Sequence, residues 1–304
     1  MTRQYRNSPR QWPHLAALWL ATILLTTIAG AANQRVGQWV EANHVLLRYE
    51  LTGRGPTTVV LLHDMGMNLE SWDEVVPAIN KGRRVLRYDL RGFGLSEKLH
   101  GPVSIDDQIE DLRALMDALH IHDPVILVGG SVGGAIAFKF AVRYPERVKA
   151  LVGLNVVTRI RRTGPPANPA LQTGRDTAKL LETEGVRAYL ATDLDWLYPM
   201  QLRTPERLLR FIGIEVAQDP LARASTMRMK SAAVDSDSEL PRIQAPTLLI
   251  AGMLNSSYTA EEWQQIAAAI PRSRLEMIQT GHHAAFESPE LVVPLLQEFF
   301  KQHE

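Results

Sequence analysis

The sequence predicts an α/β protein built on a mostly parallel, eight-stranded sheet with helices on both faces. Three observations predict this fold class. Strand-like and helix-like segments alternate along most of the chain, the strand-like runs are rich in leucine and β-branched residues, and a glycine-rich turn follows one of those runs. Continuous apolar strands are typical of parallel sheets, because helices cover both faces of such a sheet. With 304 residues, 45% of them hydrophobic, the chain can bury one large core.

The expected strands follow in chain order. Two early segments, 36–42 and 44–51, predict an antiparallel start to the sheet. The apolar runs of the buried strands lie at 57–62, 84–88, 124–128, 148–154, 247–251 and 274–278. Helical patterns separate most of these runs, as a parallel sheet requires for its crossover connections.

The helices are predicted from caps and apolar faces. Ser104 is a good N-cap with Asp107 at the third helical position, and one apolar face follows from Ile109 to Leu119. The chain ends in a helix over 289–300. Between 156 and 230 the strand rhythm stops, and helix-like segments at 176–191 and 204–216 replace it. We therefore expect a core made of residues 32–155 and 231–304, with residues 156–230 forming a helical lid.

Residues 1–31 have the features of a secretory signal peptide. Arg3, Arg6 and Arg10 precede an apolar segment at 15–28, and the residues AGA at 29–31 provide the small side chains that a signal peptidase requires. The apolar segment is shorter than the roughly 20 residues that span a bilayer, which favours cleavage over a retained anchor, the alternative interpretation. We expect a periplasmic or secreted protein with no stable membrane association after leader cleavage.

Charge and cysteine content narrow the function classes. The 33 basic and 33 acidic residues balance, so nucleic acid is not an expected partner. The chain has no cysteine, which excludes disulfides, a cysteine nucleophile and a thiolate metal site. Removal of the leader deletes three arginines and no acidic residue, so the mature chain is mildly acidic.

The glycine-rich turn after the run 124–128 has the spacing of a nucleophile elbow. Residues 129–133 read GGSVG, which places Ser131 between glycines two positions before and two positions after it. A serine on a sharp strand-to-helix turn has a strained backbone, and the glycines leave room for the crossing chains. Its hydroxyl is then exposed next to a helix N-terminus, which stabilises developing negative charge. The pattern alone also occurs in ordinary turns, so it needs support from other motifs.

Several further motifs give the chain a resemblance to the α/β-hydrolase superfamily along nearly all of its mature length. They occur in the order of that family: HDMG at 63–66, SW at 71–72, DLRGFGLS at 89–96, YPERV at 144–148 and GH at 281–282, with Glu287 and Pro289 downstream. The resemblance implies the α/β-hydrolase fold. Within the superfamily, the stretch 154–159 and the loop around His282 are most similar to 3-oxoadipate enol-lactonases and small esterases.

The resemblance also implies roles for single residues. Ser131 is the expected nucleophile and His282 its general base, with the backbone N–H groups of Met65 and Val132 as the oxyanion hole. Asp64 stands where the family usually has glycine, which leaves a hole made of main-chain groups intact. No metal or organic cofactor is implied. His283 is expected to be a structural or pocket-lining neighbour, and His63 a structural histidine.

The third member of the triad departs from the family pattern. The usual acid position after the penultimate strand holds Asn255, and the alternative position after the sixth strand holds Asn155. Three interpretations stay open: Asn255 orients the imidazole without a charge, another acid such as Asp235 or Asp237 reaches His282, or the site is a poor catalyst.

The function expected from this sequence is hydrolysis of a small carboxylic ester or lactone through an acyl-enzyme. A serine nucleophile excludes the displacement chemistry of relatives that carry aspartate there. Trp196, Tyr198 and Phe211 are candidates for an apolar substrate pocket under the lid. Export argues against the intracellular substrate of the enol-lactonases, so only the reaction class is transferred. The alternative is a ligand-binding pseudo-hydrolase with a weakened triad.

Overall fold

The computed structural model describes residues 37–160, 176–229, 232–254 and 256–304. The predicted leader, residues 1–31, lies outside these residues, as does Asn255. The fold reported below is that of the unit Trp39–Glu304.

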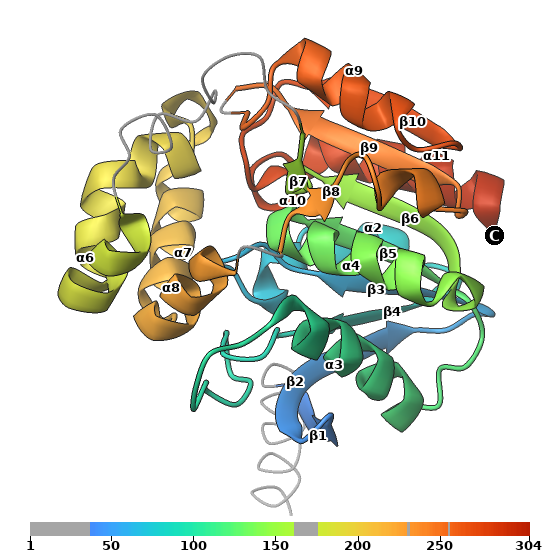
Figure 1. Cartoon of the computed structure of the whole chain (residues 1–304), viewed down its shortest axis with the longest axis horizontal. Helices are drawn as coiled ribbons and strands as arrows, with labels where there is room; N and C mark the ends of the chain where they lie inside the picture. The colour runs from blue at the N-terminus through green and yellow to red at the C-terminus, as the bar shows by residue number, and fades with distance from the viewer. Residues whose placement is uncertain (1–36, 161–175, 230–231, 255) are drawn as a thin grey trace, which may run out of the picture. The chain divides into compact units, whose positions relative to one another are not determined.

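An eight-stranded sheet forms the centre of this unit (Figure 1). Its strands lie in the order β1 (Gln38–Ala42), β2 (Val45–Gly53), β4 (Arg83–Tyr88), β3 (Thr57–Leu62), β5 (Val125–Gly130), β6 (Val148–Leu154), β9 (Thr247–Gly252) and β10 (Ser273–Ile278). β2 runs antiparallel to β4, and every pairing from β4 to β10 is parallel. The predicted mostly parallel sheet of eight strands is confirmed.

Helices cover both faces of the sheet and bury two apolar layers. The helices α3 (Ile105–Ala118), α4 (Ser131–Arg143) and α9 (Ala260–Ala268) pack on one face, and α2 (Val76–Ile79) and α11 (Pro289–His303) pack on the other. Every residue of β3, β5 and β9 is buried, because these strands are covered from both sides. The capping box predicted at the start of α3 is present, with Ser104 and Asp107 exchanging hydrogen bonds.

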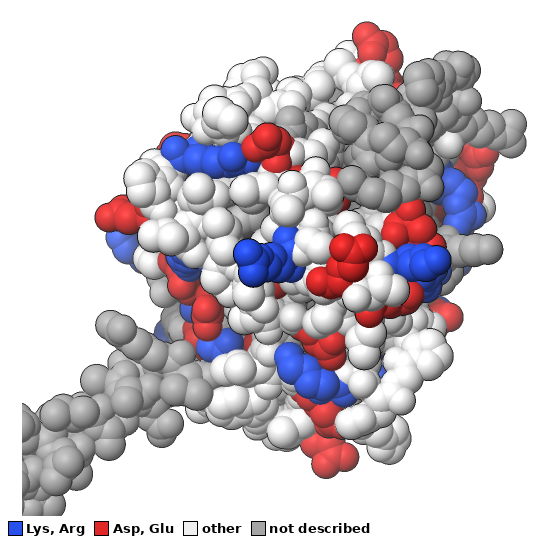
Figure 2. Space-filling model, turned by 90° about the vertical axis from the view of Figure 1, so that its left-hand side faces the viewer, with Lys and Arg blue, Asp and Glu red and all other residues white. Residues whose placement is uncertain are grey.

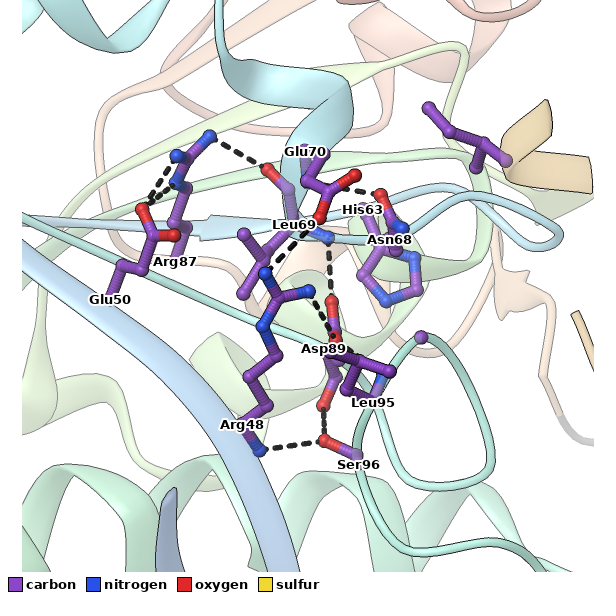
Figure 3. Close-up of polar contacts among 12 residues, drawn as sticks. Arg48, Glu50, His63, Asn68, Leu69, Glu70, Arg87, Asp89, Leu95 and Ser96 are labelled. Carbon is purple, nitrogen blue, oxygen red and sulfur yellow. Dashed lines mark hydrogen bonds and ion pairs between the residues drawn. The ribbon is translucent and has the colours of Figure 1, made fainter. Parts of the chain in front are cut away.

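The motif at 89–96 is a buried polar turn that anchors the loop after β3 (Figure 3). Oδ1 of Asp89 accepts the N–H of Leu69 at 2.7 Å, and Oδ2 accepts the N–H of Leu95 at 2.8 Å. Nη1 of Arg48 lies 3.3 Å from the same Oδ2, with both side chains buried. Asp89 therefore holds the short helix η1 (Leu69–Trp72) against the sheet, at the end of the loop that carries Met65.

In the part of the insertion between β6 and β9 that the structure describes, the α-helices are α6 (Thr177–Leu197), α7 (Pro205–Val216) and α8 (Pro220–Arg228), which form the lid. They share an apolar core of their own, which Met67 and Phe286 of the α/β core join. Two very short strands, β7 (Thr158–Arg159) and β8 (Val234–Asp235), pair in parallel at the base of the insertion, and this pairing was not predicted. Figure 2 shows the face that lies on the left in Figure 1, where the lid helices are drawn, and acidic and basic side chains are interspersed on it. Within the described ranges, no helix is both long and apolar enough to cross a membrane.

Candidate active site

The nucleophile elbow joins β5 to α4, and Ser131 is the first residue of the helix. Ser131 has φ of 47°, a left-handed conformation that is strained for any residue other than glycine. The flanking glycines are required by space: a Cβ at Gly129 would lie 2.5 Å from the carbonyl oxygen of Gly133, and a Cβ at Gly133 would lie 2.5 Å from that of His63. The turn is therefore the close crossing of chains that its sequence predicts.

His282 is placed directly against the serine. Its Nε2 lies 3.0 Å from Oγ of Ser131, across 151 positions of sequence. His282 follows β10 in the loop that begins α10 (Ala284–Glu287). For the hydroxyl to donate to Nε2, the imidazole must carry its proton on Nδ1. The pair has the geometry of a nucleophile and its general base.

The His282 ring is neutral at physiological pH. Burial lowers the pKa of His282 to about 4, with a smaller lowering by the charge of His283 when it is protonated, and the carboxylate of Asp64 opposes this shift. The indole of Trp196, on α6 of the lid, lies against the ring with centroids 5.1 Å apart and planes at 36°. A neutral imidazole accepts the proton of Ser131, whereas burial under the lid makes the imidazolium costly.

The two backbone N–H groups expected to form the oxyanion hole have no hydrogen-bond partner among the described residues. Val132 lies in the first turn of α4, where N–H groups have no partner within the helix. Met65 follows β3, next to the elbow. Neither N–H donates to any residue that the structure describes. Both groups are thus available to a negatively charged oxygen near Ser131.

The expected orienting partner of His282 is not found among the residues that the structure describes. Among the described residues, none makes a hydrogen bond to Nδ1 of His282. The predicted partner, Asn255, lies outside the described residues. Asn155 acts on the backbone instead: its amide donates to the carbonyl of Gly281 at 3.0 Å and to that of His282 at 2.9 Å. Asn155 therefore holds the backbone of the histidine loop in place and makes no hydrogen bond to Nδ1 of His282.

The alternative acids are engaged in a turn of their own. Oδ1 of Asp235 accepts the N–H groups of Asp237 and Ser238 and the hydroxyl of Ser238. Its Oδ2 lies 3.7 Å from Nη1 of Arg159. Oδ1 of Asp237 accepts the hydroxyl of Ser236 at 3.3 Å. The structure brings neither carboxylate into a hydrogen bond with His282.

The three pocket candidates separate into two groups. Trp196 contacts the His282 ring and faces the site. Tyr198 and Phe211 are fully buried, pack on each other at 5.2 Å and belong to the apolar core of the lid. Helical periodicity cannot distinguish these positions, because both groups are apolar in sequence. A cleft of about 380 Å³ beside Ser104 and α8 shares no residue with the site.

The histidines outside the dyad have different surroundings. His63 is structural, as predicted: its Nδ1 lies 2.8 Å from the carbonyl oxygen of Asp64, and its Nε2 accepts the N–H of Leu90 at 2.9 Å. Burial lowers the pKa of His63, which keeps that ring neutral. His283 pairs with Asp64, with Nδ1 and Oδ2 2.9 Å apart. The pairing of Asp64 with His283 is not visible in the sequence, because 219 positions separate the two residues.

Glu287 is a second buried carboxyl near the histidine loop. Its Oε1 accepts the N–H of His283 at 3.2 Å, and Thr280 Oγ1 lies 3.4 Å from its Oε2. Burial raises the pKa of Glu287 to about 7. Among the described residues, no group of three or more histidine and acidic side chains is arranged to hold a metal ion.

Comparisons with known proteins show the family to which the chain belongs. The family model for the alpha/beta hydrolase fold matches residues 57–289, and the chain belongs to that family. A putative 2-succinyl-6-hydroxy-2,4-cyclohexadiene-1-carboxylate synthase of Bacillus subtilis is 30% identical over 83% of this chain and 94% of the relative. A 3-oxoadipate enol-lactonase of Acinetobacter baylyi is 26% identical over 82% of this chain and 91% of the relative.

A solved structure gives the same result for the fold. The enol-lactonase from Burkholderia xenovorans LB400 superposes with a TM-score of 0.78 at 27% identity, covering 87% of this chain and all of that chain. The resemblance to the α/β-hydrolase superfamily and to its enol-lactonases is thus confirmed.

Proposed function

We propose that this protein hydrolyses a small carboxylic ester or lactone through an acyl-enzyme on Ser131. The observation that carries the proposal is the 3.0 Å contact between Oγ of Ser131 and Nε2 of His282 on a strained elbow. Family membership alone is not sufficient, since one of the relatives carries the name of a synthase.

The proposed reaction has two halves. Oγ of Ser131 attacks the carbonyl carbon while Nε2 of His282 takes its proton, and the N–H groups of Met65 and Val132 stabilise the oxyanion. The imidazolium then donates that proton to the leaving alkoxide, which departs as an alcohol. Water attacks the acyl-enzyme with the same base, which releases the carboxylic acid and restores Ser131. In a lactone, the alcohol and the acid belong to one molecule.

A panel of p-nitrophenyl esters and simple lactones tests this function. We expect turnover of short acyl esters or lactones, with an initial burst of p-nitrophenol if deacylation is slow. Because the neutral imidazole is the base, kcat/KM should fall at acidic pH as His282 is protonated, with its acid limb near the His282 pKa of about 4. A folded protein that turns over no member of the panel and binds lactones without cleaving them would support the pseudo-hydrolase instead.

We also propose that the chain is exported and that its leader is removed. Support comes from Arg3, Arg6, Arg10, the short apolar segment and the AGA at 29–31. Expression of the full chain in a bacterial host should give a periplasmic protein whose N-terminus, measured by Edman sequencing or intact mass, begins near Ala32. An intact Met1 in a fraction that needs detergent for extraction would instead support a retained anchor.

A further inference from the structure

A second histidine–carboxylate pair lies beside the proposed catalytic dyad. Asp64 follows β3, and its Oδ2 lies 2.9 Å from Nδ1 of His283 on the catalytic-histidine loop. Its Oδ1 is close to the elbow, because a Cβ added at Gly130 would lie 2.0 Å from that oxygen. Both side chains are largely buried, with 1% of His283 and 12% of Asp64 exposed. One carboxylate thus connects three loops that meet around Ser131.

The surroundings of His283 determine the charge of this pair. Its Nε2 is buried and has no hydrogen-bond partner among the described residues. In the doubly protonated ring, Nε2 would be a buried donor without an acceptor, and the ring would carry a buried positive charge. This state has a higher free energy than the neutral ring, in which Nε2 carries no proton. The favoured state is therefore a neutral ring with its proton on Nδ1, donated to Asp64. In that state the pair carries one net negative charge.

This charge lies next to the catalytic histidine. The rings of His282 and His283 are 5.1 Å apart between centroids, with their planes at 79°. Aromatic side chains cover both rings and exclude water from them, because Phe211 packs on His283 and Trp196 packs on His282. Electrostatic interactions at this distance are stronger in such surroundings than in water.

We propose that Asp64, acting through His283, is a positioning residue that supplies the negative charge facing the His282 imidazolium. The inference rests on the proposed function, in which that imidazolium forms during acylation. It gives the site a carboxylate even though the described residues place none on Nδ1 of His282. Asp64 belongs to the same loop as the expected oxyanion donor Met65, and His283 lies between its carboxylate and the His282 ring.

Two other ionisable side chains lie near the His282 ring, and each has a partner of its own. Arg223 of α8 forms a buried ion pair with Glu215 of α7, and its guanidinium stacks on Tyr189 at 4.4 Å. Glu287 of α10 is bonded to the N–H of His283, and the raised pKa of its carboxyl reduces its charge below neutral pH. Asp64 is the carboxylate that raises the pKa of His282, whereas burial, His283 when it is protonated, and Arg223 all lower that pKa.

The test replaces Asp64 by Asn, which keeps the side chain's shape and an acceptor for His283 but removes the charge. The pKa of His282, measured by NMR titration of its imidazole signals and assigned with His282→Gln, should fall by about one unit. For an ester of the panel, kcat should fall about tenfold while KM stays unchanged. The matched control is Asp111→Asn, a buried carboxylate on α3 paired with Arg91, which should change neither quantity.

A rescue separates the charge from a structural role. Asn255→Asp places a carboxylate at the position where the family resemblance has its acid, so it should restore kcat in the Asp64→Asn background. The charge of Asp64 also lies near the oxyanion donors, where it would oppose the developing negative charge, so its removal could instead raise kcat. An unchanged or increased His282 pKa or kcat in folded Asp64→Asn overturns the inference. A lowered His282 pKa in an Asp64→Asn variant of a protein that hydrolyses nothing would instead refute the proposed function, and it would confirm only that the charge of Asp64 acts on the His282 ring.

One measurement needs no variant at Asp64. The ¹⁵N shifts of His283 in the wild-type protein at pH 7 should show a neutral ring protonated on Nδ1. A doubly protonated His283 would make the pair neutral overall and would overturn the inference even if Asp64→Asn failed to fold.

Discussion

Replacing Ser131 by Ala should abolish ester hydrolysis, with kcat/KM falling by about 10⁴ or more, while the protein stays folded. The nucleophile is lost, and only the oxyanion donors and the binding contacts remain to accelerate attack by water. Stability should change little, because alanine at 131 retains the backbone conformation and removes one hydroxyl. Steady-state assays on the best ester of the panel, with circular dichroism of both proteins, measure the two effects.

A matched serine substitution controls for this result. Ser104 caps α3, and Ser104→Ala should cost about 1 kcal/mol of stability through the lost cap without changing turnover. If Ser131→Ala kept a tenth of the wild-type rate, Ser131 would not be the nucleophile.

Replacing Asp89 by Ala should destabilise the protein by about 3–5 kcal/mol, because the buried Arg48 guanidinium loses its fully buried carboxylate partner and retains the more exposed Glu70. The variant also removes the acceptor of the N–H groups of Leu69 and Leu95. Urea unfolding followed by tryptophan fluorescence measures the loss. Since the loop that ends at Leu69 carries Met65, activity should also fall in the folded fraction.

The control for Asp89 is an exposed ion pair. Asp106 is 64% exposed beside Arg143 on the surface, so Asp106→Ala should cost less than about 1 kcal/mol. A loss below that level for Asp89→Ala would contradict the anchoring role of the turn.

Most of the fold was predictable because its signals are local. The six strands from β3 to β10 of the large sheet lie where apolar runs predicted them, β1 and β2 lie in the two segments predicted to begin the sheet, and the Ser104 cap predicts the first turn of α3 correctly. The helix α8 was not predicted, because the small and polar side chains of Pro220–Arg228 give it little apolar periodicity. β7 and β8 have two residues each, too few for a strand pattern.

The site also has a part that local sequence predicts and a part that it does not. Ser131 and His282 lie within short motifs that can be recognised from the sequence alone. The pairing of Asp64 with His283 depends on how two loops meet, and neither local sequence carries that information. Trp196 and Phe211 are both aromatic lid residues, and only packing shows that Trp196 covers the His282 ring while Phe211 fills the lid core.

The central claim, a nucleophilic Ser131, is tested most directly by covalent labelling. Wild-type protein is treated with a fluorophosphonate, digested and analysed by tandem mass spectrometry, with Ser131→Ala treated in parallel. We expect a single phosphonyl adduct on Ser131 in the wild type and none in the variant, because the hydroxyl of Ser131 lies 3.0 Å from a neutral imidazole nitrogen on a strained elbow. A folded wild-type protein that remains unlabelled, or an adduct on another serine, would contradict it.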